Sequence, residues 1–278
     1  MLDQQHAATR GHRAEIEHRY GAGVHILEDP LALTLLARLC ARETLQPEIN
    51  HLVETLYTRL IWYVINTEFP RKRSAYESRM QDALSRGQRQ EGRGVFEGLM
   101  VDRSTRTVSV DIARAGILPS LTCYNTLNRV LDPMVVRQDH LIMSRAVDAQ
   151  DNVVGARIDG KKIGGPIDGR VVLFPDPMGA TGASLSTAIR YYKETFGGDP
   201  ADVMTLNLIV TPQFIRRLRD DHPEVKIYAL RLDRGMSPAE ILKTVPGSQW
   251  DEESGLNEND YIVPGGGGFG ELMNNAWV

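Results

Sequence analysis

The chain has 278 residues and a mass of 31.0 kDa, of which 42% are hydrophobic and 24% are charged. This composition excludes an intrinsically disordered chain, which would carry fewer apolar residues and more net charge. The formal net charge of −4 argues against a globally basic protein that binds nucleic acid or anionic lipid. The sequence shows no signal-peptide core, no membrane-length apolar run and only two cysteines, so we expect a cytoplasmic protein.

Two helices and a polar arm are predicted in the first third of the chain. Asp29 and Pro30 are typical of a helix start, and an apolar stretch continues to Cys40. A second helix is predicted over Gln46–Asn66, where apolar residues recur at three- and four-residue steps. The charged stretch Arg71–Gly94 favours a solvated arm or short surface helix, with an oligomer contact or effector-anion site as the alternative.

After residue 94, short aliphatic and β-branched runs alternate with helical stretches. This alternation predicts βαβ units, and hence an α/β fold with a mainly parallel central sheet flanked by helices. Residues 1–94 would pack on a core of residues 95–278 as one structural domain, with Arg234–Gly255 as a polar surface excursion. The predicted strands are Val95–Val101, Thr107–Ile112, His140–Arg145, Val153–Ile158, Val171–Phe174, Val203–Val210 and Val225–Leu230, and the predicted helices are Leu118–Leu131, Ala183–Phe196 and Pro212–Asp221.

The segment from Val171 to Ser184 carries the clearest functional pattern. A buried strand leads into a loop with one acid, two glycines and two hydroxyl side chains, and a helix follows. The N–H groups of such a loop and the helix N-terminus attract a phosphate. Asp176, at the strand end, is placed to accept both hydroxyls of a ribose diol. The spacing excludes a P-loop and a dinucleotide fingerprint, and an ordinary βα turn rich in small residues is the alternative.

Four motifs resemble those of the uracil phosphoribosyltransferase family, in the same order. Asp176-Pro-Met-Gly-Ala-Thr-Gly-Ala-Ser184 resembles the family's loop for phosphoribosyl diphosphate (PRPP), Asp-Pro-Met-x-Ala-Thr-Gly-Gly-Ser. Arg114-Ala-Gly116 resembles its pyrophosphate loop, and Ile142-Met-Ser-Arg145 its second arginine site. Leu256-Asn-Glu-Asn-Asp-Tyr-Ile-Val-Pro-Gly265 is similar to the segment that heads its uracil loop. The resemblance implies a type I phosphoribosyltransferase fold with N-terminal helices and a C-terminal base-binding loop.

The resemblance also implies a reaction and a set of site residues. The enzyme would transfer 5-phosphoribosyl from PRPP to uracil, giving UMP and pyrophosphate, with Asp176 and Arg114 as catalytic residues. Mg²⁺ would be carried by PRPP without a dedicated set of protein ligands. Family members are commonly dimers or larger homo-oligomers, and some respond to GTP. The implied PRPP-binding residues are Arg114, Ala115, Gly116, Arg145, Asp176, Pro177, Met178, Gly179, Ala180, Thr181, Gly182, Ala183 and Ser184, and the implied base-binding residues are Tyr261, Ile262, Gly267, Gly268 and Phe269.

The sequence departs from the family in the uracil loop. The family continues Pro-Gly-Leu-Gly-Asp-x-Gly-Asp, whereas this chain reads Pro264-Gly-Gly-Gly-Gly268-Phe-Gly-Glu271. Gly268 thus replaces an aspartate that touches PRPP in the family, and Glu271 replaces the last one. Asp111 is a candidate to compensate. Two alternatives stay open: a PRPP-dependent transferase for a different base, and a catalytically weak regulatory protein that binds PRPP or UMP.

Overall fold

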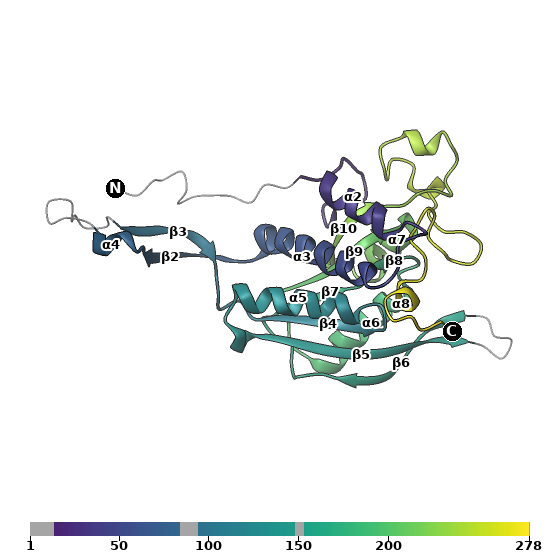
Figure 1. Ribbon diagram of the computed structural model, residues 1–278. Coiled ribbons are helices and arrows are strands. Elements are labelled where there is room, and N and C mark those ends of the chain that lie inside the picture. Colours follow the sequence, from purple (N-terminus) through teal and green to yellow (C-terminus); the bar gives the residue numbers. More distant parts are fainter. Residues whose placement is uncertain (1–13, 84–93, 148–152, 278) are drawn as a thin grey trace.

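The computed structural model describes residues 14–83, 94–147 and 153–277, and it describes only the backbone of residues 145–147 and 153–155. A central sheet has the strand order β1-β10-β9-β7-β4-β5-β6, and β8 pairs with β9 (Figure 1). Every pairing in this sheet is parallel except that of β5 with β6. The predicted mainly parallel sheet is therefore confirmed. Its strands are β1 (Val24–Ile26), β4 (Thr107–Ala113), β5 (Val136–Val147), β6 (Val153–Lys162), β7 (Val171–Pro175), β8 (Met178–Gly179), β9 (Asp202–Val210) and β10 (Lys226–Leu232).

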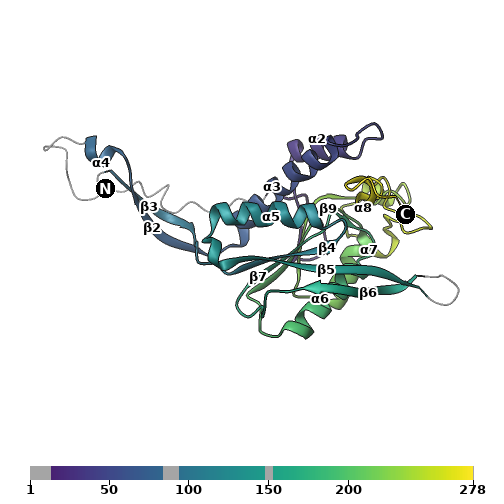
Figure 2. The ribbon, with the colours of Figure 1, turned by 60° about the horizontal axis from the view of Figure 1, so that its bottom comes forward.

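Helices cover both faces of the sheet, and each face has its own hydrophobic cluster. One cluster contains the buried residues of α2 (Pro30–Leu39), α3 (Glu48–Glu68) and α5 (Ile117–Val130). The other contains those of α6 (Ala183–Phe196) and α7 (Pro212–Asp221). Figure 2 shows α3 and α5 on one side of the sheet and α6 on the other. Because the central strands are buried on both faces, β7 reads in the sequence as a continuous apolar run, whereas β4 and β9 include buried polar residues.

The ends of the helices follow the signals in the sequence. The carboxylate of Asp29 accepts the N–H of Ala32 at 3.0 Å, and Pro30 opens α2. The hydroxyl of Thr211 caps α7 by accepting the N–H of Phe214 at 3.0 Å. These caps hold the first turns in place where N–H groups have no partner within the helix.

The stretch predicted as a solvated arm or short surface helix is largely exposed over its described residues 71–83, but it contains a β-strand that was not predicted. β2 (Arg71–Glu77) pairs antiparallel with β3 (Val95–Val101) in a separate two-stranded sheet, and α4 (Met80–Ala83) follows β2. This hairpin projects from the body of the molecule (Figures 1 and 2). β3 was predicted as part of the core, but it lies in the hairpin instead. The predicted division at residue 94 stays a prediction, and it would separate these paired strands.

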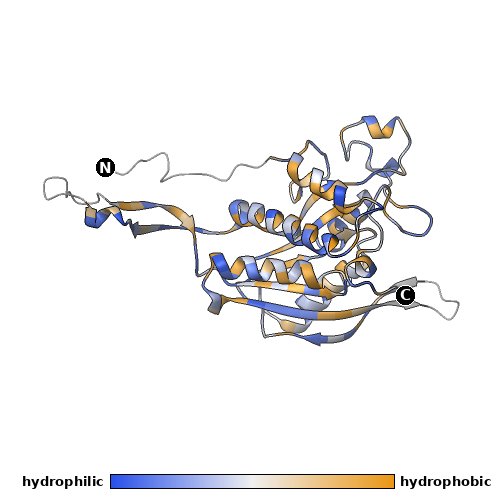
Figure 3. Cartoon of the chain, in the orientation of Figure 1, coloured by the Kyte–Doolittle hydropathy of each residue, from blue (hydrophilic) through white to orange (hydrophobic). Residues whose placement is uncertain are grey.

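β2 is largely solvent-exposed on both faces, which explains why its sequence lacks the alternation of a half-buried strand. Tyr76 and Phe96 face each other across the pair and are each 52% exposed. Figure 3 shows hydrophobic and hydrophilic residues mixed along the hairpin. The polar excursion Arg234–Gly255 is also mostly exposed, but the buried carboxylate of Glu253 anchors it by pairing with Arg234 and accepting the hydroxyl of Tyr20.

Candidate active site

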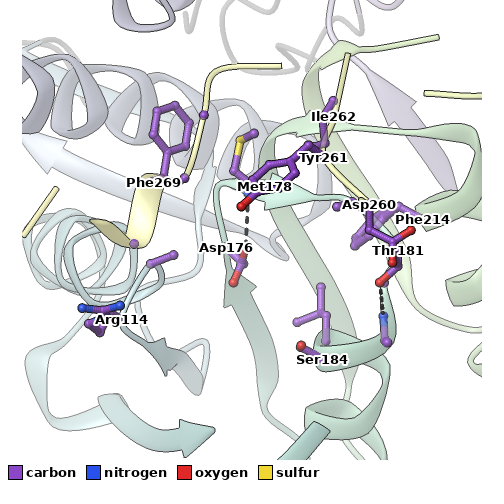
Figure 4. A pocket seen from close by; sticks show the side chains of 18 of the residues that line it. Arg114, Asp176, Met178, Thr181, Ser184, Phe214, Asp260, Tyr261, Ile262 and Phe269 are labelled. Atoms are coloured by element: carbon purple, nitrogen blue, oxygen red, sulfur yellow. Dashed lines mark hydrogen bonds between the residues drawn. The ribbon is translucent and has the colours of Figure 1, made fainter. Parts of the chain in front are cut away.

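A cavity of about 1020 Å³ lies at the carboxyl ends of the central parallel strands. Ligands of open α/β sheets bind at this edge. In Figure 4, Asp176 stands at the end of β7, with Arg114 on one side and Thr181 and Ser184 on the other. The cavity is lined by Ala113, Arg114, Ala115, Met143, Asp176, Met178, Ala180, Thr181, Gly182, Ala183, Ser184, Leu185, Phe214, Glu258, Asn259, Asp260, Tyr261, Ile262, Gly267, Gly268, Phe269, Gly270 and Glu271.

The loop after β7 is fastened to the neighbouring strand β9 by its main chain. The N–H of Asp176 donates to the carbonyl of Leu206 at 3.0 Å, and the amide of Asn207 donates to the carbonyl of Asp176 at 2.6 Å. Further along, the hydroxyl of Thr211 donates to the carbonyl of Ala180 at 2.6 Å. These bonds fix the loop backbone before any ligand binds.

Two glycines let this loop pass close to α7 and start α6. A Cβ at Gly179 would lie 2.9 Å from the ring of Phe214 and 3.0 Å from Val210, so a side chain does not fit there. Gly182, the N-cap of α6, has φ 78° and supplies no side chain to accept the first-turn N–H groups. The N–H of Ala183 makes a long bond of 3.4 Å to the hydroxyl of Thr181, and the helix dipole adds partial positive charge at this wall of the cavity, an arrangement that suits an anion.

Asp176 is the titratable group at the centre of the cavity. Its carboxylate accepts the N–H of Met178 at 3.1 Å. The side chain opens to the cavity but is otherwise surrounded by protein, and this burial raises its pKa to about 6, although the Met178 N–H lowers it. At neutral pH the Asp176 carboxylate is therefore mostly ionised but poorly solvated. It can accept further hydrogen bonds, and the two hydroxyls of a diol would supply them.

Arg114 follows β4 and reaches the C-terminal segment. Its Nη1 donates to the carbonyl of Ala276 at 3.0 Å, and its Nη2 lies 3.5 Å from the Oε1 of Glu271. The peptide bond between Ala113 and Arg114 is cis. Gly116 permits the tight turn after β4, because a Cβ at this residue would lie only 2.8 Å from the backbone of Ile112. A guanidinium therefore stands on the cavity wall next to a carboxylate.

The C-terminal wall is a glycine-rich segment fastened by side chains. Gly265, with φ 61°, donates its N–H to the buried carboxylate of Asp233 at 2.8 Å, and Arg231 donates to its carbonyl at 2.9 Å. Arg231 also pairs with Asp233 through two bonds of 2.6 and 2.7 Å. Tyr261 and Ile262 line the cavity from the turn that precedes this segment (Figure 4). This wall therefore presents main-chain groups and an aromatic ring.

Most of the site residues predicted from the sequence line this cavity. The exceptions lie behind the lining or have side chains outside the described residues. Gly116, Pro177 and Gly179 support the loop backbones from outside the cavity lining. The backbone of Arg145 pairs with Ala156 in the β5–β6 ladder, but its side chain lies outside the described residues. Asp111 lies off the lining and pairs with His140. The ligand-binding roles of all these residues stay predictions.

Several lining residues were missed by the sequence reasoning. Met143 lies within the Ile142–Arg145 motif but was given no role, and Phe214 reaches the cavity from α7, whose position depends on the tertiary fold. The other missed residues are Ala113, Leu185, Glu258, Asn259, Asp260, Gly270 and Glu271. For Glu258, Asn259 and Asp260 the sequence did carry a signal, because Asn257 is a residue typical of turns. In the structure its side chain accepts the N–H groups of Asn259 and Tyr261 at 3.0 and 2.9 Å, and the resulting turn carries residues 258–260 into the cavity.

No group of three or more His, Cys, Asp and Glu side chains in the described parts of the chain is arranged to hold a metal ion. Over the same residues, no helix combines the length and the apolar character needed to cross a bilayer.

Comparisons with known proteins agree with the fold and with the motifs. A family model described as uracil phosphoribosyltransferase matches residues 26–248. The uracil phosphoribosyltransferase of Caldanaerobacter subterraneus subsp. tengcongensis is 36% identical over 112 residues, which is 40% of this chain and 42% of that protein. That of Acinetobacter baylyi is 30% identical over 127 residues, or 46% and 49% of the two chains. These matches thus span less than half the length of each relative.

One solved structure shares the fold over nearly the whole chain. The AQ2163 protein from Aquifex aeolicus superposes with a TM-score of 0.66 over 92% of this chain and 99% of its own, at 18% identity. Together with the sheet order and the family model, this confirms the predicted type I phosphoribosyltransferase-like fold.

Proposed function

Because this chain belongs to the uracil phosphoribosyltransferase family, we propose that it transfers the 5-phosphoribosyl group of PRPP to uracil, giving UMP and pyrophosphate. The observation that carries this proposal is that three motifs line the same cavity: the loop 176–184, Arg114 and the segment 261–269. Each motif meets a different part of the two substrates.

The loop after β7 binds the ribose 5-phosphate part of PRPP. The first-turn N–H groups of α6 and the hydroxyls of Thr181 and Ser184 receive the 5′-phosphate. Asp176, which stands closer to the sheet, accepts the two ribose hydroxyls. Since the loop is hydrogen-bonded to β9, it is preorganised for this ligand and little order is lost on binding.

Arg114 holds the leaving diphosphate, with Arg145 as the second proposed arginine. A guanidinium binds such oxygens in a bidentate way, so Arg114 exchanges its contact with the Ala276 carbonyl for the ligand. The Mg²⁺ that PRPP carries neutralises part of the diphosphate charge. The bond between ribose C1 and the diphosphate oxygen breaks with its electron pair on pyrophosphate. The uracil nitrogen attacks C1 from the opposite face, and its proton passes to solvent water. Catalysis rests on positioning and charge stabilisation.

A different acceptor base is the second candidate, and the base-side wall of the cavity favours it. Glu258, Asn259 and Asp260 line the cavity beside Tyr261, and Gly268 lacks the carboxylate that the family motif has. Hydrogen-bonding groups at the base site can change which heterocycle is accepted. A GTP effector, a homo-oligomer and a cytoplasmic location stay predictions.

The test is conversion of radiolabelled uracil in the presence of PRPP and Mg²⁺, run beside a thermal-shift titration with PRPP alone. PRPP-dependent formation of UMP supports the proposal. Pyrophosphate release with another base but not with uracil would support the second candidate. Thermal stabilisation by PRPP without pyrophosphate release for any base would contradict an enzymatic function and favour a regulatory nucleotide-binding protein.

A further inference from the structure

The space of the side chain missing at Gly268 is taken by Glu271. A Cβ placed on Gly268 would lie 2.3 Å from the Oε2 of Glu271 and 3.2 Å from its Cδ. Gly268 is the N-cap of α8 (Phe269–Leu272), so one helical turn brings the Glu271 side chain back over it. The Glu271 carboxylate therefore stands where a side chain at residue 268 would begin.

The same carboxylate faces Arg114 on the cavity wall. Oε1 of Glu271 is 3.5 Å from Nη2 of Arg114, and the carbonyl of Ala276 accepts Nη1 of the same guanidinium at 3.0 Å. Both partners of Arg114 thus come from the C-terminal segment, and together they set the plane of its guanidinium. The side chains of Arg114 and Glu271 are 38% and 30% exposed, so solvent screening makes this pair an orienting contact rather than a large source of stability.

The position of Glu271 is set by the core. Phe269 and Met273, on either side of it, are buried. The amide of Gln46 donates to the carbonyls of Leu272 and Met273 at 3.0 and 3.1 Å. Because α8 is tied in this way to the region where α3 begins, the carboxylate is held in place without a ligand.

We propose that Glu271 is a positioning residue: its carboxylate replaces the one missing at 268 and orients Arg114 toward the leaving diphosphate. The inference rests on the proposed function, and it names the residue that takes over the role of the carboxylate missing at Gly268. The structural alternative is helix capping, since a Glu at the third position of a helix often accepts the N–H of the N-cap residue. A Gln at 271 keeps that capping ability but loses the charge, so it separates the two roles.

Steady-state kinetics with PRPP and uracil test this directly. We expect Glu271→Gln and Glu271→Ala to lower kcat at least about tenfold while the KM for PRPP changes less than about threefold, because orientation of Arg114 matters in the transition state. The matched control Glu252→Gln removes an exposed acid outside the cavity and is expected to keep the wild-type kcat. A wild-type kcat in Glu271→Gln would overturn the inference.

A rescue experiment sharpens the test. Gly268→Asp alone places a side chain against the Glu271 carboxylate and is expected to lower kcat. In the double variant Gly268→Asp/Glu271→Ala, the new carboxylate begins where the old one stood, and we expect kcat within about threefold of wild type. A double variant no better than Glu271→Ala contradicts the inference, because mere capping or packing by Glu271 would not be restored from residue 268.

A third readout needs no turnover. Phenylglyoxal modification of Arg114, followed by peptide mass spectrometry with the exposed Arg129 as internal reference, reports how well the guanidinium is held. We expect Arg114 to react at least about threefold faster in Glu271→Ala and to return to the wild-type rate in the double variant. Equal rates in wild type and Glu271→Ala overturn the inference even if the wild type makes no UMP, whereas missing UMP formation by itself refutes only the proposed function.

Discussion

The two walls of the cavity are held in different ways. The phosphate-side loop 176–184 is bonded through its own main chain to β9, a strand within the central sheet. The glycine-rich segment 264–271 is held by side chains, with Asp233 and Arg231 at Gly265 and Gln46 at the C-terminal end of α8. A wall built into the sheet changes little unless the fold changes, but single substitutions can move a wall held by side chains. The sequence fits this difference, because the glycine-rich segment 264–271 departs strongly from the family motif and the loop 176–184 does not.

The largest effect is expected at the sheet-held wall. Asp176→Asn keeps the size of the side chain but removes the charge that accepts the ribose diol, and we expect PRPP affinity to fall about 100-fold, or roughly 3 kcal/mol. Isothermal titration with PRPP and Mg²⁺ at pH 8 measures this. Asp251→Asn, at an exposed acid off the cavity, is the control. An affinity within threefold of wild type would contradict the proposed role.

The same substitution is expected to stabilise the fold at high pH. Burial raises the pKa of Asp176 from 3.8 to about 6, so the folded protein binds this proton more tightly than the unfolded chain. The ionised group therefore destabilises the fold above pH 6, less so as the pH falls through 6, and not at all below 3.8. We expect Asp176→Asn to add about 1–3 kcal/mol to the free energy of unfolding at pH 8 and nearly nothing below pH 4, measured by urea denaturation. An equal gain at both pH values would refute this.

The side-chain-held wall is expected to respond in substrate recognition. Asp233→Asn weakens the acceptor of the Gly265 N–H and leaves Arg231 without its charged partner. We expect the KM for uracil to rise about tenfold and the unfolding free energy to drop by about 2 kcal/mol, with PRPP affinity nearly unchanged. Kinetics with each substrate varied in turn check this. If PRPP affinity fell as much as uracil recognition, the two walls would not be independent.

The smallest expected effects are changes in stability on substituting the glycines of that wall. Melting temperatures give the sign of each change. A Cβ at Gly270, within α8, would have as its nearest neighbour the backbone nitrogen of Ala115 at 4.0 Å, so Gly270→Ala is expected to stabilise by about 0.5–1 kcal/mol. Gly267 has φ 85°, and Gly267→Ala is expected to destabilise by about 1 kcal/mol. The same sign for both variants would show that backbone conformation does not limit this segment.

The sequence was most informative where one physical signal determines local structure. β7 was predicted from its continuous apolar run, β9 from its aliphatic and β-branched residues, and α2 from its cap at Asp29. β2 was missed because a strand exposed on both faces has no apolar pattern.

For the site, the motifs located the phosphate loop and Arg114. They marked the segment of Met143 but gave that residue no role, and they did not reveal Phe214, which reaches the cavity from α7 through the packing of distant segments. The contact between Glu271 and Arg114 was equally hidden, because it depends on the path of the chain after Gly268.

A crystal structure of the protein with PRPP and Mg²⁺ tests the central claim most directly. The 5′-phosphate is expected at the N–H groups of residues 180–184, the ribose hydroxyls at the carboxylate of Asp176, and the diphosphate at Arg114. A phosphate bound elsewhere, or a ribose that does not touch Asp176, would contradict the account.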